Sequence, residues 1–499
     1  MGMAHVLLTL CLWLASAQEL SLQNWMGGLA PAIKNLSILD LALPGTHDTM
    51  TYDLSRRISD GANDLPPSVS WILHEIAPIL GIAEVGQFIR SQAVTQRLNI
   101  TEQLENGVRF LDFRIMYTAG PESGSLAQHD WYCLHLVETN QKSMLYLRAL
   151  KAFLDAHESE VVVIWLSRHG SSCKSGNDQY PGVSAAVKQQ FWSTFRELFG
   201  GYIFDPSRSR LNATTYAELI TTGQRLVVYA SDHSEFTGGD ERVYDACTHL
   251  SNTLKGGDLT DIPGSISSLR TEFASSAQKR AQLKANDQLY LLSMAGSPPA
   301  SVTTDAAKIK YLPLAKDSIR KKCAALFRIP NMTDWCPETL GDAEQLRNYY
   351  LQAVLEEVAV SGNETAAMAK RAALVGGGGE HEGRESSPVL SLPGAIYLDA
   401  LDYGGLIRTG IGPLEPHTGE ENGVESGNEG YSYIDTLLLF NARAGCASLR
   451  EAKGDIGADN DGAEFCQKVI AQIQARRARN PARSWNDPAH GRLLGWPHQ

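Results

Sequence analysis

Basic residues are scarce in this chain relative to acidic ones. Its 499 residues include 44 Lys and Arg against 56 Asp and Glu, which gives a formal net charge of −12. Proteins that bind nucleic acid or anionic membranes over a broad surface need an excess of Lys and Arg, so this balance argues against both classes. We expect no nucleic-acid partner, and we expect contact with a membrane surface to be local and transient.

Metal-binding cysteine spacings and membrane-spanning runs are also missing. The eight cysteines include no Cys-X2-Cys pair, which argues against a structural zinc site. Beyond the N-terminus no apolar stretch approaches the ~20 residues that a membrane helix needs, and GRLLGWPHQ at the C-terminus has no apolar tail. With 43% hydrophobic residues, the composition is that of a globular protein with one elaborated domain or two ordinary ones.

The N-terminal MGMAHVLLTLCLWLASAQ resembles a cleaved secretion signal. It has an apolar run at Val6–Leu14, followed by the small residues ASA at 15–17. A buried N-terminal helix is the alternative. We therefore expect a signal peptide at residues 1–17 and a secreted or extracellular protein. Asn-X-Ser/Thr glycosylation tripeptides agree with a secreted location; they begin at Asn35, Asn99, Asn212, Asn331 and Asn363.

The cysteine count predicts disulfides and at least one unpaired thiol. Loss of Cys11 with the signal leaves an odd number of cysteines, so at least one is free or pairs with another chain. The local pairs Cys323–Cys336 and Cys446–Cys466 are the disulfides that we expect first.

Apolar, β-branched segments alternate with longer amphipathic ones, a pattern typical of strands and crossover helices around a parallel sheet. The predicted strands are Ile38–Leu43, Val108–Tyr117, Trp131–Val137, Val161–Ser167, Arg225–Ser231, Gln288–Ala295 and Ala395–Leu401. The predicted helices between them are Met144–His157, Val187–Phe199, Ile266–Lys284 and Ala343–Ala359.

This element order predicts an α/β fold, a distorted TIM-type (β/α)8 barrel with loop insertions and C-terminal helices. A barrel needs one strand more than the pattern shows, and we expect it within Ala307–Pro330. An open, doubly wound parallel sheet is the alternative.

The predicted barrel domain covers residues 18–440, and a helical extension packed on it covers residues 441–499. Two helices, Ile434–Ala444 and Ala463–Arg479, are expected after the last strand. Pro66–Arg90 is an apolar insertion after the first strand; it is either a lid or lipid-contacting rim, or a helix packed over the barrel mouth.

The segment LALPGTHD places a histidine and a carboxylate, His47 and Asp48, directly after a short apolar strand and a Pro-Gly turn. Strand ends are where barrel enzymes carry their chemistry, and imidazole exchanges protons near neutral pH. A turn with a helix cap is the alternative interpretation of the motif alone.

The apolar strand GVRFLDFRI contains three charged residues, Arg109, Asp112 and Arg114. Charges left unpaired inside a protein cost several kcal/mol, so we expect these to be paired. Strand alternation puts Asp112 and Arg114 on one face, where the guanidinium can hold an anionic oxygen while the carboxylate orients it. A purely structural ion pair is the alternative.

Other polar residues follow later strands. His135 ends the third predicted strand, Arg168 and His169 follow the fourth, and Asp399 and Asp402 lie at the end of the last. A barrel brings such strand ends into one ring. If the barrel closes, the last strand adjoins the first, and a carboxylate there can hold the first histidine in one tautomer.

Together these motifs resemble the X-domain superfamily of phosphatidylinositol-specific phospholipases C, particularly its bacterial-like, single-domain branch. PGTHD is similar to that family's first-histidine motif and GVRFLDFRI to its Arg/Asp strand. CLHLVETN, with the later FLDAHESEVVVIWLS, is similar to its second-histidine strand and crossover. The resemblance covers Leu36–His169, and beyond it rests on IYLDALD. The family usually has glycine after its second histidine, where this chain has Leu136.

The resemblance implies a role for each matched residue. His47 is expected as general base, His135 as general acid and Arg114 as the phosphate clamp. The supporting carboxylates are expected to be Asp48, Asp112 and Asp399, and the substrate-binding residues Arg168, His169 and Asp402.

The implied reaction is phosphodiester hydrolysis through a cyclic phosphate. The implied substrate is a phospholipid or another phosphodiester. Because Arg114 stands where calcium-dependent relatives place metal ligands, we expect no metal and no other cofactor. Two alternatives stay open: a metal-dependent glycerophosphodiester or sphingolipid phosphodiesterase on the same fold, and a catalytically silent secreted binding protein.

Overall fold

A computed structural model describes residues 20–58, 86–87, 89–90, 93–119, 129–167, 183–254, 262–294, 395–398, 432–453 and 460–479. Among these residues, parallel strands form one hydrogen-bonded path in the order β8-β7-β6-β3-β1-β11-β10-β9. The strands are β1 (Leu43–Thr46), β3 (Phe110–Ala119), β6 (Val162–Ser167), β7 (Leu226–Ala230), β8 (Tyr244–Asp245), β9 (Leu250–Leu254), β10 (Leu289–Ser293) and β11 (Ala395–Leu398).

This path confirms a mixed α/β fold around a parallel sheet. The two ends of the path, β8 and β9, form no ladder with each other within the described part of the chain, so no closed barrel is observed. The late strand β11 pairs with β1 in parallel, as predicted, with Thr46 opposite Leu398.

A second, antiparallel sheet extends from the long strand β3. It contains β4 (His129–His135), β5 (Val137–Lys142) and β2 (Leu54–Ile58). The prediction that Trp131–Val137 is a barrel strand is therefore wrong, because β4 turns back along β3 instead of following a crossover. An apolar run of this length looks the same in both settings.

One further strand prediction differs from the structure, and two strands were not predicted. Ile38–Asp40 forms a 3-10 turn, because Ser37 and Asp40 cap each other's backbone, and the strand starts only at Leu43. Short β8 and β9 add the strands that the pattern missed. The expected site for a missing strand, Ala307–Pro330, lies outside the described residues.

The helical predictions agree better with the structure, because amphipathic spacing persists over several turns. The expected helix at Ala343–Ala359 lies outside the described residues. The helices are α2 (Trp25–Ile33), α6 (Ile100–Glu105), α7 (Ser143–Ala156), α8 (Ala185–Phe199), α9 (Tyr216–Thr222), α10 (His233–Phe236), α11 (Ala246–His249), α12 (Ile262–Ala285), α16 (Ser432–Lys453) and α17 (Asn460–Arg479). The 3-10 turns are η1 (Leu22–Asn24), η2 (Ile38–Asp40), η3 (Thr51–Asp53), η5 (Gly200–Tyr202) and η6 (Leu211–Ala213). No helix in the described ranges is both long and apolar enough to span a bilayer.

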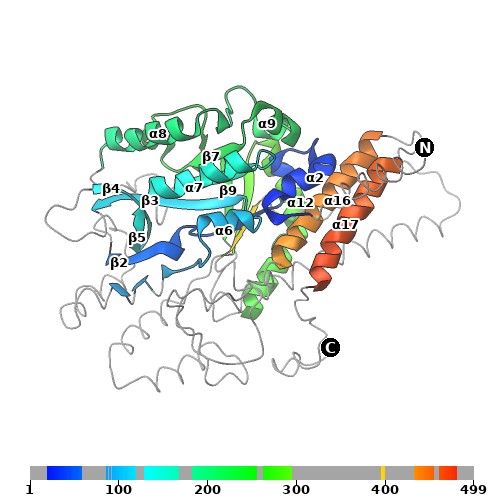
Figure 1. Ribbon diagram of the computed structural model, residues 1–499, viewed down its shortest axis with the longest axis horizontal. Coiled ribbons are helices and arrows are strands. Elements are labelled where there is room, and N and C mark those ends of the chain that lie inside the picture. Colours follow the sequence, from blue (N-terminus) through cyan, green and yellow to red (C-terminus); the bar gives the residue numbers. More distant parts are fainter. Residues whose placement is uncertain are drawn as a thin grey trace, which may run out of the picture.

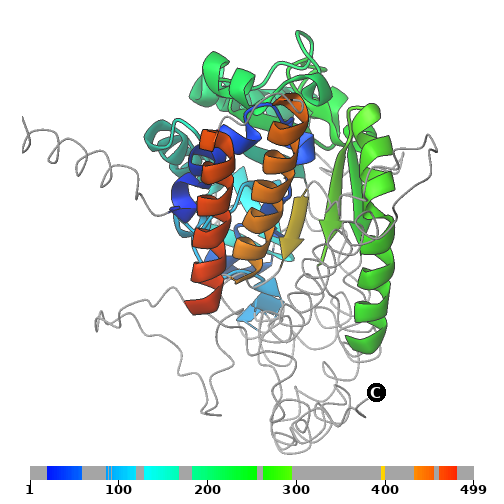
Figure 2. The same cartoon turned by 90° about the vertical axis from the view of Figure 1, so that its right-hand side faces the viewer.

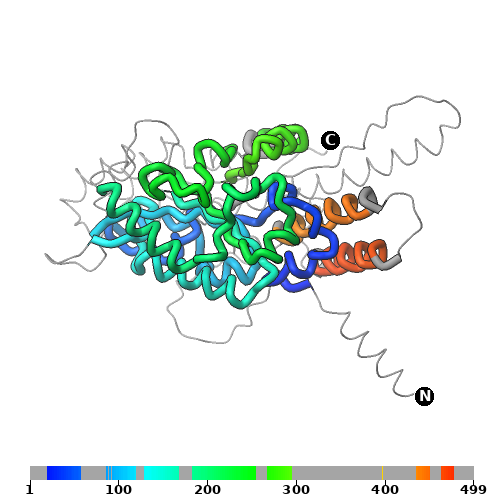
Figure 3. The backbone as a smooth tube through the Cα atoms, turned by 90° about the horizontal axis from the view of Figure 1, so that it is seen from above, coloured from blue at the N-terminus to red at the C-terminus, as the bar shows by residue number. Residues whose placement is uncertain are grey.

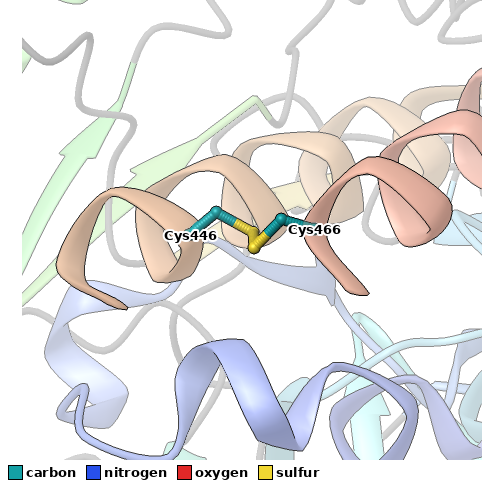
Figure 4. The surroundings of a disulfide bond; sticks show 2 residues. All are labelled: Cys446 and Cys466. Atoms are coloured by element: carbon teal, nitrogen blue, oxygen red, sulfur yellow. A yellow bond between two sulfur atoms is a disulfide. The ribbon is translucent and has the colours of Figure 1, made fainter. Parts of the chain in front are cut away.

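The C-terminal helices α16 and α17 form a hairpin at the end of the molecule opposite the β3–β4 hairpin (Figure 1). They run side by side (Figure 2), and both contact α2, the first α-helix among the described residues (Figure 3). The predicted disulfide Cys446–Cys466 joins them, with a Cα–Cα distance of 5.9 Å (Figure 4). Helix α16 runs unbroken across residue 440, where the sequence places a domain boundary.

Two other cysteines lie among the described residues. Cys133 in β4 is buried and free, and Cys247 is disulfide-bonded. The predicted pair Cys323–Cys336 lies outside the described residues.

Gly445 in α16 packs directly on the backbone of α2. A Cβ added there would lie 2.7 Å from the carbonyl carbon and oxygen of Ala32. Gly→Ala normally stabilises a helix by up to about 1 kcal/mol, but here the clash is with backbone. We expect Gly445→Ala to lower the free energy of unfolding by ~1–3 kcal/mol in urea denaturation.

Gly201 provides the control for this substitution, because no atom lies within 4 Å of the position its Cβ would take. Gly201→Ala should leave the urea midpoint nearly unchanged. A Gly445→Ala protein as stable as wild type would show that α16 does not pack on α2 as described.

Candidate active site

His47 and Asp48 follow β1 at a sharp turn. Asp48 has a φ of 48°, in the left-handed region that Asp tolerates better than most residues. Its N–H donates to the Asp112 carboxylate at 3.2 Å. The turn therefore ties the end of β1 to the face of β3 that carries Asp112.

Asp112 and Arg114 lie on one face of β3, as strand alternation predicted. Arg114 Nε donates to Asp112 Oδ2 at 3.0 Å and lies 2.7 Å from Asp48 Oδ1. The second oxygen of Asp112 accepts from Ser167 Oγ, at the end of β6, at 3.0 Å. Arg109, at the start of the same strand, is not part of this group; it pairs with buried Glu160 at 2.7 Å.

His135 reaches the same place from the end of β4, in the antiparallel extension. Its Nδ1 donates to the Ala93 carbonyl at 2.7 Å and lies 3.3 Å from Asp48 Oδ2. A carbonyl can only accept, so Nδ1 keeps its proton and Nε2 is the nitrogen that changes protonation state. The expectation that His135 belongs to this group is met, although the strand that carries it is not a barrel strand.

The site has an accessible layer of nitrogen groups over a buried layer of carboxylates. The side chains of His47, Arg114 and His135 are 12%, 15% and 14% exposed, whereas those of Asp48 and Asp112 are 0% exposed. The two imidazole rings are 6.4 Å apart between centroids, at 72°. An incoming group meets the nitrogen side chains first, which suits an anion.

The two histidines have different hydrogen-bond partners. Arg114 Nη2 donates to His47 Nε2 at 2.6 Å, so this nitrogen is an acceptor, and Asp48 Oδ2 lies 3.4 Å from the same atom. His135 instead has two acceptors beside Nδ1. Burial lowers the pKa of His135, and the negative charge of Asp48 opposes that shift.

The carboxylates also resemble a cation site. Ligand atoms of His47, Asp48 and Asp112 lie within 4.8 Å of one another. The Arg114 guanidinium already lies 3.0 Å or less from both carboxylates. A divalent cation fits this group poorly, because its charge would repel the guanidinium at that distance.

Leu136 lies between β4 and β5 where the chain reverses, with His135 opposite Val137. Its φ is 66°, in the region that favours glycine. This conformation costs a residue with a Cβ about 1–2 kcal/mol. The backbone beside His135 therefore adopts the glycine-favouring shape although the residue is leucine.

The other predicted site residues lie outside the described ranges: Arg168, His169, Asp399 and Asp402. Strand β11 ends at Leu398, opposite Thr46, the last residue of β1, which directly precedes His47. Sequence reasoning missed Ser167 and Ala93. Ser167 ends a predicted strand and was in principle detectable, whereas Ala93 acts through its carbonyl, which no side-chain pattern reveals.

Comparison with known proteins finds similarity to one family over part of the chain. The family model described as PI-PLC X 1 matches residues 82–246, which include Asp112, Arg114 and His135. PI-PLC X domain-containing protein 1 of Mus musculus is 32% identical over 38% of this chain and 55% of its own length. The Homo sapiens protein of the same name is 28% identical over 42% of this chain and 58% of its own length. The chain thus spans little more than half of these relatives.

Solved structures of bacterial proteins are also similar. A phosphatidylinositol-specific phospholipase C of S. aureus matches 61% of this chain and 87% of its own, with a TM-score of 0.35 and 16% identity. That of Listeria monocytogenes matches 61% and 89%, with a TM-score of 0.34 and 15% identity. The family resemblance predicted from the motifs is confirmed by the family model and the curated relatives.

The neighbouring Asp48 charge should control the protonation of His135. We expect Asp48→Asn to lower the pKa of His135, because it removes the negative charge that favours the imidazolium. NMR titration of the imidazole protons measures this shift. Asp130→Asn, at an exposed carboxylate on the same strand, is the control and should leave the pKa unchanged. An unchanged or raised pKa in Asp48→Asn would contradict this electrostatic assignment.

Proposed function

Because the chain carries a region similar to the PI-PLC X family, we propose that it is a phosphoric diester hydrolase of the phosphatidylinositol phospholipase C type. One observation carries the proposal. Two imidazoles and a guanidinium share one accessible face, and buried carboxylates hold them there. This arrangement suits a phosphate bound between a general base and a general acid.

The surroundings of each histidine suit one role. His47 Nε2 accepts a hydrogen bond from Arg114, so its lone pair is available, and His47 serves as the base that takes the proton of a substrate hydroxyl. That hydroxyl attacks the adjacent phosphorus, and His135 gives its Nε2 proton to the departing alcohol. Arg114 then donates to the phosphate oxygens in place of His47. Water opens the resulting cyclic phosphate with the two histidine roles reversed.

Supporting groups complete the proposed site. Asp48 and the Ala93 carbonyl favour the protonated His135, and Asp112 with Ser167 orients Arg114. Asp399 is proposed to orient His47, because in the sequence it directly follows β11, which adjoins β1. Arg168, His169 and Asp402 stay predictions as substrate-binding residues.

We propose that the parallel strands form a distorted barrel that is open between β8 and β9. In an open doubly wound sheet, these end strands would lie at opposite edges. Only the four-residue helix α11 separates them, and it lies against both. Such a connection spans far less than a sheet of this width, since neighbouring strands are ~4.8 Å apart.

We also propose a secreted protein that meets its lipid or other phosphodiester substrate outside the cytosol. The disulfide between α16 and α17 supports this, because such bonds persist in oxidising compartments. Among the glycosylation tripeptides, Asn35 is exposed. The signal peptide itself lies outside the described residues.

The two histidines should be required for turnover. We expect His47→Ala and His135→Ala each to lower kcat by ~10²–10⁴-fold, the usual contribution of a positioned acid or base. Release of phosphorylated head group from phosphatidylinositol vesicles and from a soluble inositol phosphodiester measures it. His129→Ala, at an exposed histidine that starts the same strand as His135, should retain activity. Equal, negligible release by wild type and all three variants would support a silent binding protein instead.

Turnover should not need a divalent metal. The Arg114 guanidinium already pairs with the carboxylate oxygens of Asp48 and Asp112, which a divalent cation would need as ligands. A chelator such as EDTA should therefore leave kcat unchanged. If EDTA abolishes turnover and calcium or magnesium restores it, the metal-dependent phosphodiesterase alternative is correct.

A further inference from the structure

A short, largely buried segment, Ala93–Gln96, contacts both candidate catalytic histidines. Gln96 Nε2 donates to the His47 carbonyl at 2.9 Å, and Thr95 Oγ1 donates to the same oxygen at 3.3 Å. At the other end of the segment, the Ala93 carbonyl accepts from His135 Nδ1 at 2.7 Å. Ala93, Thr95 and Gln96 are fully buried. Their contacts therefore act from behind the site rather than on its accessible face.

The peptide between His47 and Asp48 is bound on both sides. Thr95 and Gln96 hold its carbonyl, while its N–H donates to Asp112. Asp48 needs support in its left-handed conformation, which costs about 1–2 kcal/mol. If the carbonyl lost its donors, this peptide could rotate, and both flanking side chains would move with it.

The segment is itself held rigidly. The backbone N–H groups of Thr95 and Gln96 both donate to Thr51 Oγ1, at 3.1 and 3.0 Å. Thr51 lies in η3, the turn that follows the His47–Asp48 corner. The segment and the corner thus form one closed hydrogen-bond network, which transmits a change in one part to the other.

We propose that Gln96 is a positioning residue, which fixes His47 through its carbonyl and, through the same rigid segment, keeps the Ala93 carbonyl on His135. The Gln96 side chain is fully buried, so it acts from behind the accessible face. The geometric part of this proposal stands on the network alone, and its kinetic consequence rests on the proposed function. One segment then sets the separation of the base from the acid, so its disturbance affects both histidines together.

The kinetic test uses Gln96→Met, which keeps the length of the side chain and removes its donor. We expect kcat for phosphatidylinositol cleavage to fall ~10–100-fold, the cost of misplacing a catalytic group by about 1 Å. KM should change much less, because binding contacts remain. Thr95→Val should also lower kcat, and Thr95→Ser, which keeps the hydroxyl, should restore it.

Gln103→Met is the matched control. Gln103 is equally buried, and its Nε2 donates to two backbone carbonyls, those of Thr49 and Leu98, at 2.9 and 2.7 Å. The substitution therefore removes a similar donor nearby without releasing the His47 carbonyl. We expect a similar loss of stability with kcat near wild type. An equal fall in kcat in Gln103→Met would mean general loosening and would overturn the proposal.

A spectroscopic test works without turnover. In nitrogen-15 histidine spectra, the His135 Nδ1 proton should be protected and hydrogen-bonded in wild type and in Gln103→Met, and shifted or lost in Gln96→Met. An unchanged His135 signal in Gln96→Met would overturn the proposal. If wild type cleaves no phosphodiester, the proposed function fails, and this spectrum alone decides the role of Gln96.

Discussion

Two carboxylates without solvent exposure, Asp48 and Asp112, hold the candidate site together. Each lies within 4.0 Å of His47 and contacts Arg114, and Asp48 also approaches His135. Burial of two negative charges is costly unless cations and donors surround them, so the nitrogen side chains cannot move away independently. With both imidazoles neutral, the carboxylates outweigh the guanidinium, and uptake of one proton makes the group neutral.

The cluster of carboxylates and nitrogen side chains forms only if β1 and β3 are correctly aligned. A distant part of the chain supports the start of β1. The Asn441 carboxamide in α16 binds both the N–H and the carbonyl of Ala42, at 2.7 and 3.0 Å. Trp25 in α2 donates to the Gly107 carbonyl, just before β3. The disulfide and α17 in turn hold α16. The C-terminal hairpin is therefore part of the support of the candidate site, although it follows the motifs of that site by several hundred residues.

The sequence was enough to predict those parts of the candidate site that side-chain chemistry and local periodicity determine. Alternation in β3 was enough to pair Asp112 with Arg114, and His47 stood out because it follows a strand directly. His135 was selected for a reason that the structure corrects, since β4 is antiparallel to β3. The sequence could not reveal β8, which is two residues long, or the acceptor role of Ala93, because a backbone carbonyl has no signature in the sequence.

The most direct measurement is a crystal structure with a bound phosphodiester analogue. The account predicts that the anion accepts hydrogen bonds from Arg114, with the ring of His47 on one side of it and Nε2 of His135 on the other. An anion bound elsewhere, with Arg114 still donating to His47, would contradict it.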